Sequence, residues 1–478
     1  SVTHSTWKCA AGCWSKKPKG WKKEGNQVVV ARQKGIKWIR RVGEISALLF
    51  PLAFGSSFIA SVNAATIQVS ATIQVPAVAG SLVAAVAAAS SGDVLVLAPG
   101  VHQGPITIEQ PLTITGSHKS VIDGKGTGST ITVAAADVVI RGITVRNSGR
   151  ELATMDSGIF INKSGHRALV ENNHIFDNLF GVYLWGPKDA IARGNRIRGL
   201  QTRHVNSRGN GVSVWNSPGS IVENNKIRFG RDGIFSTTSK RNIFRNNDFR
   251  HTRIAIHYMY TNNSTVTGNV SQGNHVGFAL MFSKKLKVTG NHSIGDRDHG
   301  ILLNYTNNSV IEGNLVKDGK AKCVFIYNSS KNIFQGNRFE GCQIGIHFTA
   351  GSERNQVTGN AFIANATQVK YVGTRDIDWS SNGRGNYWSD NPAFDLDGNG
   401  IADTPYRPND MVDQVVWAHP AAKLLLNSPG IQVLRWSQSR FPSLHPGGVL
   451  DSAPLMKPIE IDIKKEIEIS ANQTGNKS

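Results

Sequence analysis

Residues 255–269 read AIHYMYTNNSTVTGN, and residues 277–291 read GFALMFSKKLKVTGN. The two segments start 22 residues apart and follow one pattern: alternating apolar positions, a turn rich in Ser, Asn and Lys, a short second apolar piece, and Gly-Asn. Alternation with a period of two is typical of β-strands. A repeat this short indicates a solenoid in which each repeat forms one coil.

The pattern extends from Asp156 to Asn391, and its most regular landmark is the asparagine that closes each repeat. These asparagines are Asn173, Asn195, Asn225, Asn247, Asn269, Asn291, Asn314, Asn337 and Asn360. Successive asparagines are 22, 30, 22, 22, 22, 23, 23 and 23 residues apart. Because the core fixes the coil length, we expect the eight extra residues after Asn195 to bulge outward, as a docking surface or as a neutral insertion.

A single repeat has room for two or three short strands and cannot bury their faces alone, so neighbouring coils must stack. Equivalent residues of successive coils then form rows with a spacing of about 4.8 Å. The closing asparagines form one such row and can hydrogen-bond along it. Apolar rows that must face the core include Ile159, Val182, Val212, Ile234, Ile256, Phe278, Ile301, Val324 and Ile346. The sequence therefore predicts an all-β chain, a right-handed parallel β-helix of roughly 22-residue coils.

The ends of the chain differ from the repeats. Residues 79–90 (AGSLVAAVAAAS) are expected to form a helix that caps the first coil and protects its unpaired strand edge. We expect a presequence and signal peptide at 1–64, the cap and first coils at 65–155, and regular repeats at 156–391. We expect a calcium-like loop and C-terminal cap at 392–426, followed by an extended partner-binding tail at 427–478.

Residues 28–64 resemble a secretory signal, with a basic end, an apolar run from Ile45 to Ile59 and a small-residue cleavage site at 62–64. A membrane anchor is the alternative, although the run is short and contains Pro51. Cys9 and Cys13 precede this segment without a second Cys/His pair at zinc spacing. We therefore expect export to an oxidising compartment, where Cys323 and Cys342 either pair or remain thiols.

The formal net charge is +20, and residues 1–64 carry eleven of the lysines and arginines. The remaining basic excess is spread along the chain and fits an acidic partner, an anionic glycan or a membrane surface. Dense blocks of Lys and Arg, which nucleic-acid binding requires, are missing from the sequence. We therefore expect no nucleic-acid partner.

Three further motifs narrow the family: NYWSD at 386–390, DLDGNGIADTPY at 395–406, and VLRWSQSRFPSLHPGGVLDSAPLM at 433–456. With these motifs and the repeats, nearly the whole chain after residue 64 resembles the NosD family of periplasmic accessory proteins of nitrous-oxide reductase maturation. The resemblance implies copper binding, an inner-membrane ABC transporter and a copper chaperone as partners, and nitrous-oxide reductase as the client. It also implies a role in assembling the copper-sulfur centre of that enzyme.

One outward-facing surface contains the candidate copper ligands. Its apolar and aromatic residues indicate either a binding surface or a face that a loop or the C-terminal tail covers. His257 and Met259 share one side of a strand, and Met281 follows Met259 by one 22-residue period. Thioether sulfur with imidazole suits Cu(I), so His257, Met259 and Met281 are predicted to form a copper site. The alternative is that the methionines fill gaps under a covering segment.

A second candidate site lies in the DLDGNGIAD segment. Asp395, Asp397, Asn399 and Asp403 place hard oxygen ligands at alternate positions around a glycine turn, as a calcium loop requires. Tyr406 stands at the twelfth position, where calcium loops usually have an acidic ligand. The segment is therefore predicted to be a calcium site with a remote or water ligand, with a plain Asx-rich turn as the alternative.

The outward-facing surface consists of two rows, one through His257 and one through Met259 and Met281. We find no catalytic constellation in these rows, because they contain no carboxylate, Lys or Arg. Asp296, Asp298 and His299 form the nearest acidic cluster, in a turn before Gly300. The sequence therefore predicts a protein that is not an enzyme. A polysaccharide lyase or epimerase of the β-helix type and a structural or adhesive solenoid remain the alternatives.

Overall fold

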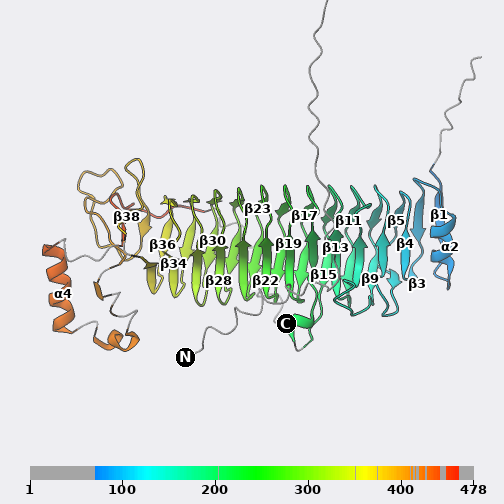
Figure 1. Cartoon of the computed structure of the whole chain (residues 1–478), viewed down its shortest axis with the longest axis horizontal. Helices are drawn as coiled ribbons and strands as arrows, with labels where there is room; N and C mark the ends of the chain where they lie inside the picture. The colour runs from blue at the N-terminus through cyan, green and yellow to red at the C-terminus, as the bar shows by residue number, and fades with distance from the viewer. Residues whose placement is uncertain are drawn as a thin grey trace, which may run out of the picture. The chain divides into compact units, whose positions relative to one another are not determined.

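The computed structural model describes residues 70–202, 204–349, 351–373, 375–409, 411–412, 415, 419–425, 428–441 and 448–461. The described chain contains three long parallel sheets and one short one. Each coil contributes one strand to each long sheet, so the predicted parallel β-helix is confirmed (Figure 1). The expected presequence and signal peptide lie outside the described residues.

Sheet 1 contains the strands that precede the closing asparagines, and its 13 strands pair in chain order. They are β1 (Thr72–Val75), β2 (Val94–Leu97), β5 (Thr113–Thr115), β8 (Val139–Arg141), β11 (Leu169–Glu171), β14 (Ile191–Arg193), β17 (Ile221–Glu223), β20 (Ile243–Arg245), β23 (Thr265–Thr267), β26 (Lys287–Thr289), β29 (Val310–Glu312), β32 (Ile333–Gln335) and β35 (Gln356–Thr358).

Sheet 2 contains the strands that follow those asparagines, again 13 in number. They are β3 (Gly100–Gln103), β6 (Ser120–Asp123), β9 (Thr144–Arg146), β12 (His174–Phe176), β15 (Arg196–Arg198), β18 (Lys226–Arg228), β21 (Asp248–Arg250), β24 (Val270–Gln272), β27 (His292–Ile294), β30 (Leu315–Lys317), β33 (Arg338–Glu340), β36 (Ala361–Ile363) and β39 (Tyr387–Trp388).

Sheet 3 has 12 strands, which are longer than those of the other two sheets in the regular coils. They are β4 (Ile106–Ile108), β7 (Ile131–Val133), β10 (Ser157–Ile161), β13 (Phe180–Trp185), β16 (Val212–Trp215), β19 (Asp232–Thr237), β22 (Ile254–Met259), β25 (Val276–Met281), β28 (His299–Asn304), β31 (Lys322–Tyr327), β34 (Ile344–Thr349) and β37 (Thr367–Val372).

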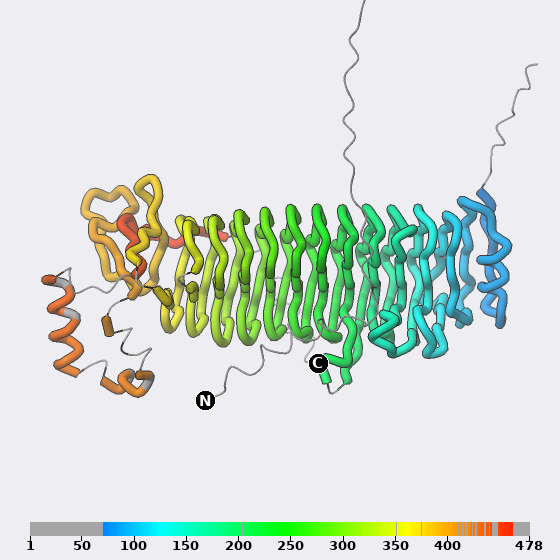
Figure 2. The backbone as a smooth tube through the Cα atoms, viewed as in Figure 1, coloured from blue at the N-terminus to red at the C-terminus, as the bar shows by residue number. Residues whose placement is uncertain are grey.

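The coils stack so that equivalent residues lie next to each other, as the tube in Figure 2 shows. Ile234 of β19 pairs with Ile256 of β22, which pairs with Phe278 of β25. All three side chains are buried in the main core cluster, which runs along the inside of the coils. The predicted inward row is therefore confirmed, and its continuous burial is the main source of stability of the solenoid.

The closing asparagines form the predicted ladder inside the solenoid. In each coil the asparagine backbone N and Nδ2 both donate to Oδ1 of the asparagine in the next coil; for Asn247 and Asn269 these distances are 3.0 and 2.9 Å. The ladder continues to Asn386, where the carboxylate of Asp451 takes the place of a further asparagine. Asp451 Oδ2 accepts from the Asn386 backbone N at 2.7 Å and from Trp388 Nε1 at 2.8 Å.

Asp451 belongs to a segment that returns to the last coils. Next to it, β40 (Val449–Leu450) pairs with β38 (Ile377–Asp378) in a two-stranded parallel sheet. The region expected to be an extended tail also contains α4 (Pro429–Arg440), which follows the 3₁₀ helix η2 (Pro420–Leu425). Residues 449–455 thus provide hydrogen-bond partners for the backbone groups of the last coil, which a free tail would leave unpaired.

At the other end, α2 (Ser81–Ala88) forms within the segment predicted to be a helical cap. Its buried residues Leu82 and Val86 are four positions apart and therefore lie on one face. This face contacts β1, β3 and β4 at the start of the solenoid (Figure 1).

The long repeat after Asn195 contains the expected outward bulge. Its surplus residues form an exposed loop with the 3₁₀ helix η1 (Val205–Ser207) between β15 and β16. In the part of the chain that the structure describes, no helix is both long and apolar enough to cross a membrane.

Candidate functional site

The outer face of sheet 3 holds the predicted copper ligands. Met259 of β22 pairs directly with Met281 of β25, so the predicted register of the two methionines is confirmed. Both side chains are half-buried. Neighbouring strands are about 4.8 Å apart, which brings the two thioether groups within reach of one ion. Trp215 lies in the same row but two strands away from Met259, beyond the strand that holds Thr237, so it is not a direct neighbour of the methionines.

His257 lies on β22 two positions before Met259, on the same side of the strand. Its imidazole is 11% exposed, and Nδ1 lies 3.1 Å from Oδ2 of Asp232. Asp232 in turn accepts from Nε and Nη2 of Arg253 at 2.8 and 2.6 Å. Burial alone would raise the pKa of Asp232, but the hydrogen bonds from His257 and Arg253 outweigh it and hold the pKa well below its usual range.

The Asp232 contact decides which nitrogen of His257 can act as a ligand. An ionised carboxylate only accepts hydrogen bonds, so Nδ1 carries a proton, and in the neutral imidazole the lone pair is on Nε2. Metal-binding histidines commonly donate their second nitrogen to a carboxylate in this way. His257, Met259 and Met281 therefore fit a Cu(I) ion in donor chemistry, tautomer and register.

Sequence reasoning missed Asp232 because strict alternation would point it into the core, like Ile234 two residues later. The paired residues of β19 and β22 are Asp232–Ile254 and Ile234–Ile256, with Gly233 between them outside the regular register. This irregularity turns Asp232, and the residue at the same position of the following coils, outward. A third outward row results, and it includes Asp232, Ile254, Val276, His299 and Lys322.

Part of the outer face is not exposed to water. Among the described residues, neighbouring side chains of the same sheet cover it, rather than the loop or C-terminal tail that the sequence left as an alternative. Ala279 and Leu302 are 0% and 4% exposed. They pack with Val276, Ile254 and Phe325 in a small apolar cluster separate from the main core. The cause is the third outward row, because its apolar side chains cover the neighbouring row.

An aromatic row follows the methionines at the next corner of the coils. The rings of Tyr260 and Phe282 stack at 5.2 Å, and Phe282 stacks on Tyr305 at the same distance. Tyr260 is 52% exposed. The aromatic row borders the two methionines on the open side of the face, and its backbone has positive φ at each of the three residues.

The same face holds two further histidines near its C-terminal end. His299 and His347 both lie against the ring of Phe325, at centroid distances of 5.4 and 4.9 Å. Burial, with Lys322 adding to it, lowers the pKa of His299 to about 4 and that of His347 to about 3. The ammonium of Lys322 lies 4.1 Å from the Phe325 ring centroid and would repel a cation bound here.

Cys323 and Cys342 form a disulfide bond, which resolves the alternatives left open by the sequence. Both residues are buried. Their sulfurs are joined to each other, so this pair has no thiolate to offer to a metal.

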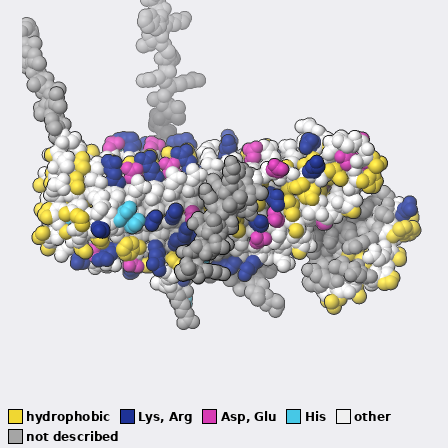
Figure 3. Space-filling model, turned by 180° about the vertical axis from the view of Figure 1, so that it is seen from behind, with side chains coloured by type: hydrophobic (Ala, Val, Ile, Leu, Met, Phe, Trp, Pro, Cys, Tyr) yellow, Lys and Arg dark blue, Asp and Glu magenta, His cyan; other side chains and the backbone are white. Residues whose placement is uncertain are grey.

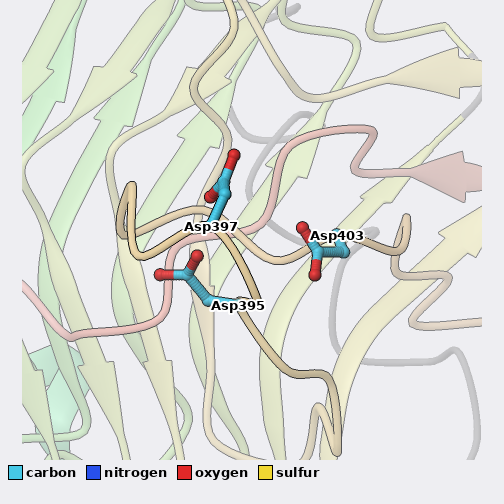
Figure 4. Close-up of side chains that lie close together, drawn as sticks. All are labelled: Asp395, Asp397 and Asp403. Atoms are coloured by element: carbon cyan, nitrogen blue, oxygen red, sulfur yellow. The ribbon is translucent and has the colours of Figure 1, made fainter.

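The acidic loop brings together three of its four predicted residues. Carboxylate oxygens of Asp395, Asp397 and Asp403 lie within 4.8 Å of one another (Figure 4). Asp395 also accepts backbone hydrogen bonds from Gly398, Asn399 and Gly400, as an Asx-rich turn would. The Asn399 amide donates to Asp397 and its oxygen accepts from the Ile401 backbone, so this side chain serves the turn. Hydrogen bonds from Gly400 and its neighbours lower the pKa of Asp395.

The outer face of sheet 1 has a different composition. Glu171 pairs with Arg193 at 2.7 Å, and Glu223 pairs with Arg245 at 2.5 Å, between neighbouring strands. Figure 3 shows Lys and Arg side chains next to Asp and Glu on one side of the molecule. Such partly exposed pairs neutralise one another and contribute little stability. The outer face of sheet 3 differs from this surface: it carries the two paired methionines and a small cluster of buried apolar side chains.

The fold and this face define a parallel β-helix protein that presents potential ligands on the outside of one sheet. A family model described as "Periplasmic copper-binding protein (NosD)" matches residues 199–393. A protein of Stutzerimonas stutzeri, named as a probable ABC transporter binding protein NosD, is 45% identical over 375 residues, which cover 76% of this chain and 86% of that protein. The protein of the same name from Pseudomonas aeruginosa is 44% identical, over 76% of this chain and 87% of its own. The chain belongs to the NosD family.

Solved structures with a similar architecture include an exopolygalacturonase of Thermotoga maritima, with 12% identity and a TM-score of 0.47. The match covers 59% of this chain and 84% of that one. A mannuronan C-5 epimerase module of Azotobacter vinelandii has 16% identity and a TM-score of 0.41, over 64% of this chain and 86% of its own.

Proposed function

We propose that this chain is a periplasmic copper-binding scaffold that holds Cu(I) on the outer face of sheet 3. The observation that carries the proposal is the pairing of Met259 with Met281 next to His257, whose Nδ1 faces the carboxylate of Asp232. Two thioethers and one neutral imidazole are soft to borderline donors, which favour Cu(I) over Ca²⁺ or Mg²⁺. The description of the matching family as periplasmic and copper-binding supports the same assignment.

The partners follow from the family. The relatives are named as ABC transporter binding proteins, and we extend this partnership to the present chain. In this account the scaffold docks on an inner-membrane transporter, receives copper from a chaperone, and assists assembly of the copper-sulfur centre of nitrous-oxide reductase. Copper is its cargo, and the chain performs no turnover of its own.

A direct test is complementation in a nosD deletion strain of a denitrifying bacterium. Wild-type protein is expected to restore an active reductase with a full copper content. The Met259→Leu/Met281→Leu protein is expected to reach the periplasm at the same level and to restore much less activity. Full restoration by this variant would show that the two methionines on the outer face of sheet 3 are not needed for maturation of the reductase.

A second candidate function is polysaccharide cleavage or epimerisation, because the structure places Asp232, Arg253 and His257 together on an outer face. Such enzymes need an acid or base that reaches the substrate. Asp232 is 1% exposed, and its two oxygens are occupied by Arg253 and His257. This arrangement favours a positioning role over proton transfer. Incubation with alginate or polygalacturonate, followed by product detection, separates the two functions.

A calcium ion at Asp395, Asp397 and Asp403 is a further proposal. The three carboxylates are close enough to share one ion, with water completing the shell. The ion would rigidify the loop next to the strand segment that closes the last coil. It would therefore act on stability and leave copper binding unchanged.

A further inference from the structure

A hollow of about 420 Å³ lies between the inserted loop and the corners of the next coils. The insertion contributes Val205, Asn206 and Arg208. The opposite wall comes from the corners that precede β19, β22, β25 and β28. These corners contribute Gly230, His251, Thr252, Arg253, His275 and Arg297. The insertion, which the regular coils lack, therefore creates one side of this hollow.

The lining is strongly cationic. It contains three arginines and two histidines, and no carboxylate belongs to it. Three acidic residues lie nearby. Asp296 is buried and interacts electrostatically with Arg297, and the other two are already engaged. Asp232 is buried beneath Arg253, and Asp298 pairs with His275 at 2.9 Å. Within the described part of the chain, neither Arg208 nor Arg297 forms an ion pair with a carboxylate of the lining, so the hollow keeps an excess of positive charge.

The arginines keep hydrogen-bond donors that the protein does not use. A guanidinium has five N–H groups. Arg208 donates from Nε and Nη2 to the Thr202 carbonyl, and Arg253 donates two to Asp232. Within the described part of the chain, the exposed Arg297 side chain has neither a hydrogen-bond nor an ion-pair partner. Next to the lining, Nε of Arg231 is buried and has no hydrogen-bond partner among the described residues.

Burial and like charge both act on Arg231, next to the lining. Desolvation lowers the pKa of its guanidinium, and the charge of Arg253 lowers it further. Gathering like charges around a hollow is unfavourable unless an opposite charge enters it. Guanidinium groups recognise planar and tetrahedral oxyanions through paired N–H donors.

We infer that this hollow binds an oxyanion group, such as a carboxylate, sulfate or phosphate, through Arg208, Arg253 and Arg297. Asn206 supplies a further polar group from the insertion, whereas the Thr252 hydroxyl on the opposite wall already donates to Oδ1 of Asn274. The site is separate from the copper ligands and does not depend on the proposed copper function. The two are nevertheless linked, because Arg253 lines the hollow and also fixes Asp232, which holds His257.

Titration calorimetry of the whole secreted protein at low ionic strength tests this inference, with inorganic phosphate, sulfate and a triglutamate peptide as probes. Chloride serves as the anion control. Arg297→Gln is the decisive variant, because its side chain is exposed and makes no hydrogen bond within the described part of the chain. It is expected to weaken binding by about tenfold, since a charge-assisted hydrogen bond is lost. Arg196→Gln, an exposed position on sheet 2, is the matched control and should bind like the wild type.

The ranking of the probes identifies the source of the anion. Tighter binding of phosphate or sulfate assigns the hollow to a free oxyanion, and tighter binding of triglutamate assigns it to acidic side chains of a protein partner. Arg208→Gln should reproduce the loss seen with Arg297→Gln. The inference is overturned when no probe binds more tightly than about 1 mM, or when Arg297→Gln binds like the wild type.

Discussion

Nδ1 of His257 lies 3.1 Å from Oδ2 of Asp232, although 25 residues separate the two in the chain. The contact joins neighbouring strands β19 and β22 and fixes the ring orientation from the buried side. Because Asp232 is also bonded to Arg253, the carboxylate cannot turn away without breaking an ion pair. His257 is therefore held with Nε2 directed away from Asp232, which is the geometry that a metal ligand needs.

The first prediction concerns Asp232→Asn. This substitution keeps the shape but removes the charge that selects the His257 tautomer, so Cu(I) affinity should fall by about 10- to 100-fold. A Cu(I) competition titration measures it, with circular dichroism to verify the fold. An affinity equal to the wild type would show that Asp232 only anchors Arg253.

The second prediction uses Asp296, a buried carboxyl that accepts hydrogen bonds from Ser271, Ser293 and the Asn274 backbone. Burial raises its pKa to about 6. A carboxyl with a raised folded-state pKa binds its proton more tightly in the native state, so its contribution to stability is lost as pH rises from about 4 through 6.

Asp296→Asn should therefore stabilise the protein at pH 7 by up to about 3 kcal/mol. An asparagine already stands at the equivalent position one coil earlier: Nδ2 of Asn274 donates to Ser271 at 2.8 Å. His299 and His347 titrate in the opposite sense, so the measurement is the difference between variant and wild type in urea unfolding at pH 4.5 and 7. A difference independent of pH would contradict the raised pKa.

The third prediction tests the coil register. Val288 is fully buried and pairs with Val266 and Ile311 in the inward row of sheet 1. Val288→Asp would place an unpaired charge in the core and should cost more than about 3 kcal/mol. Lys287→Asp, the exposed neighbour on the same strand, is the control and should fold. A soluble Val288→Asp protein with an unchanged Tm is incompatible with this register.

The fourth prediction concerns the acidic loop. If Asp395, Asp397 and Asp403 hold calcium, chelation should lower the Tm, and added calcium should restore it. Asp397→Ala should abolish both responses. Asp376→Ala, at an exposed carboxylate outside this group, is the control that keeps them. If the chelator leaves the Tm of the wild-type protein unchanged, the loop is only a turn and binds no calcium.

Much of the fold could be predicted because its information is periodic. A 22-residue spacing alone places Met259 next to Met281, and the asparagine ladder follows from the same spacing. The Asp232–His257 contact was missed because the backbone irregularity at Gly233 reverses the direction of the side chain before it. No period in the sequence marks such an irregularity.

Features that depend on distant parts of the chain were also missed. Asp451 completes the ladder from 65 residues beyond Asn386, and nothing local marks it as a substitute for asparagine. The burial of Ala279 and Leu302 depends on side chains of a third row that alternation assigns to the core. The cationic hollow needs both the insertion and four later corners, so only the folded structure assembles it.

The proposed copper site depends on Met259 and Met281 as its thioether ligands. Titration of the secreted protein with Cu(I) under reducing conditions, in competition with a chromogenic chelator, tests it most directly. Met259→Leu/Met281→Leu keeps the volume and apolarity of the face, and Met155→Leu/Met456→Leu removes the same number of thioethers elsewhere. We predict an affinity loss of at least about tenfold in the first variant and none in the second. Equal affinities in the first variant and the wild type would contradict the account and place the copper elsewhere in the protein.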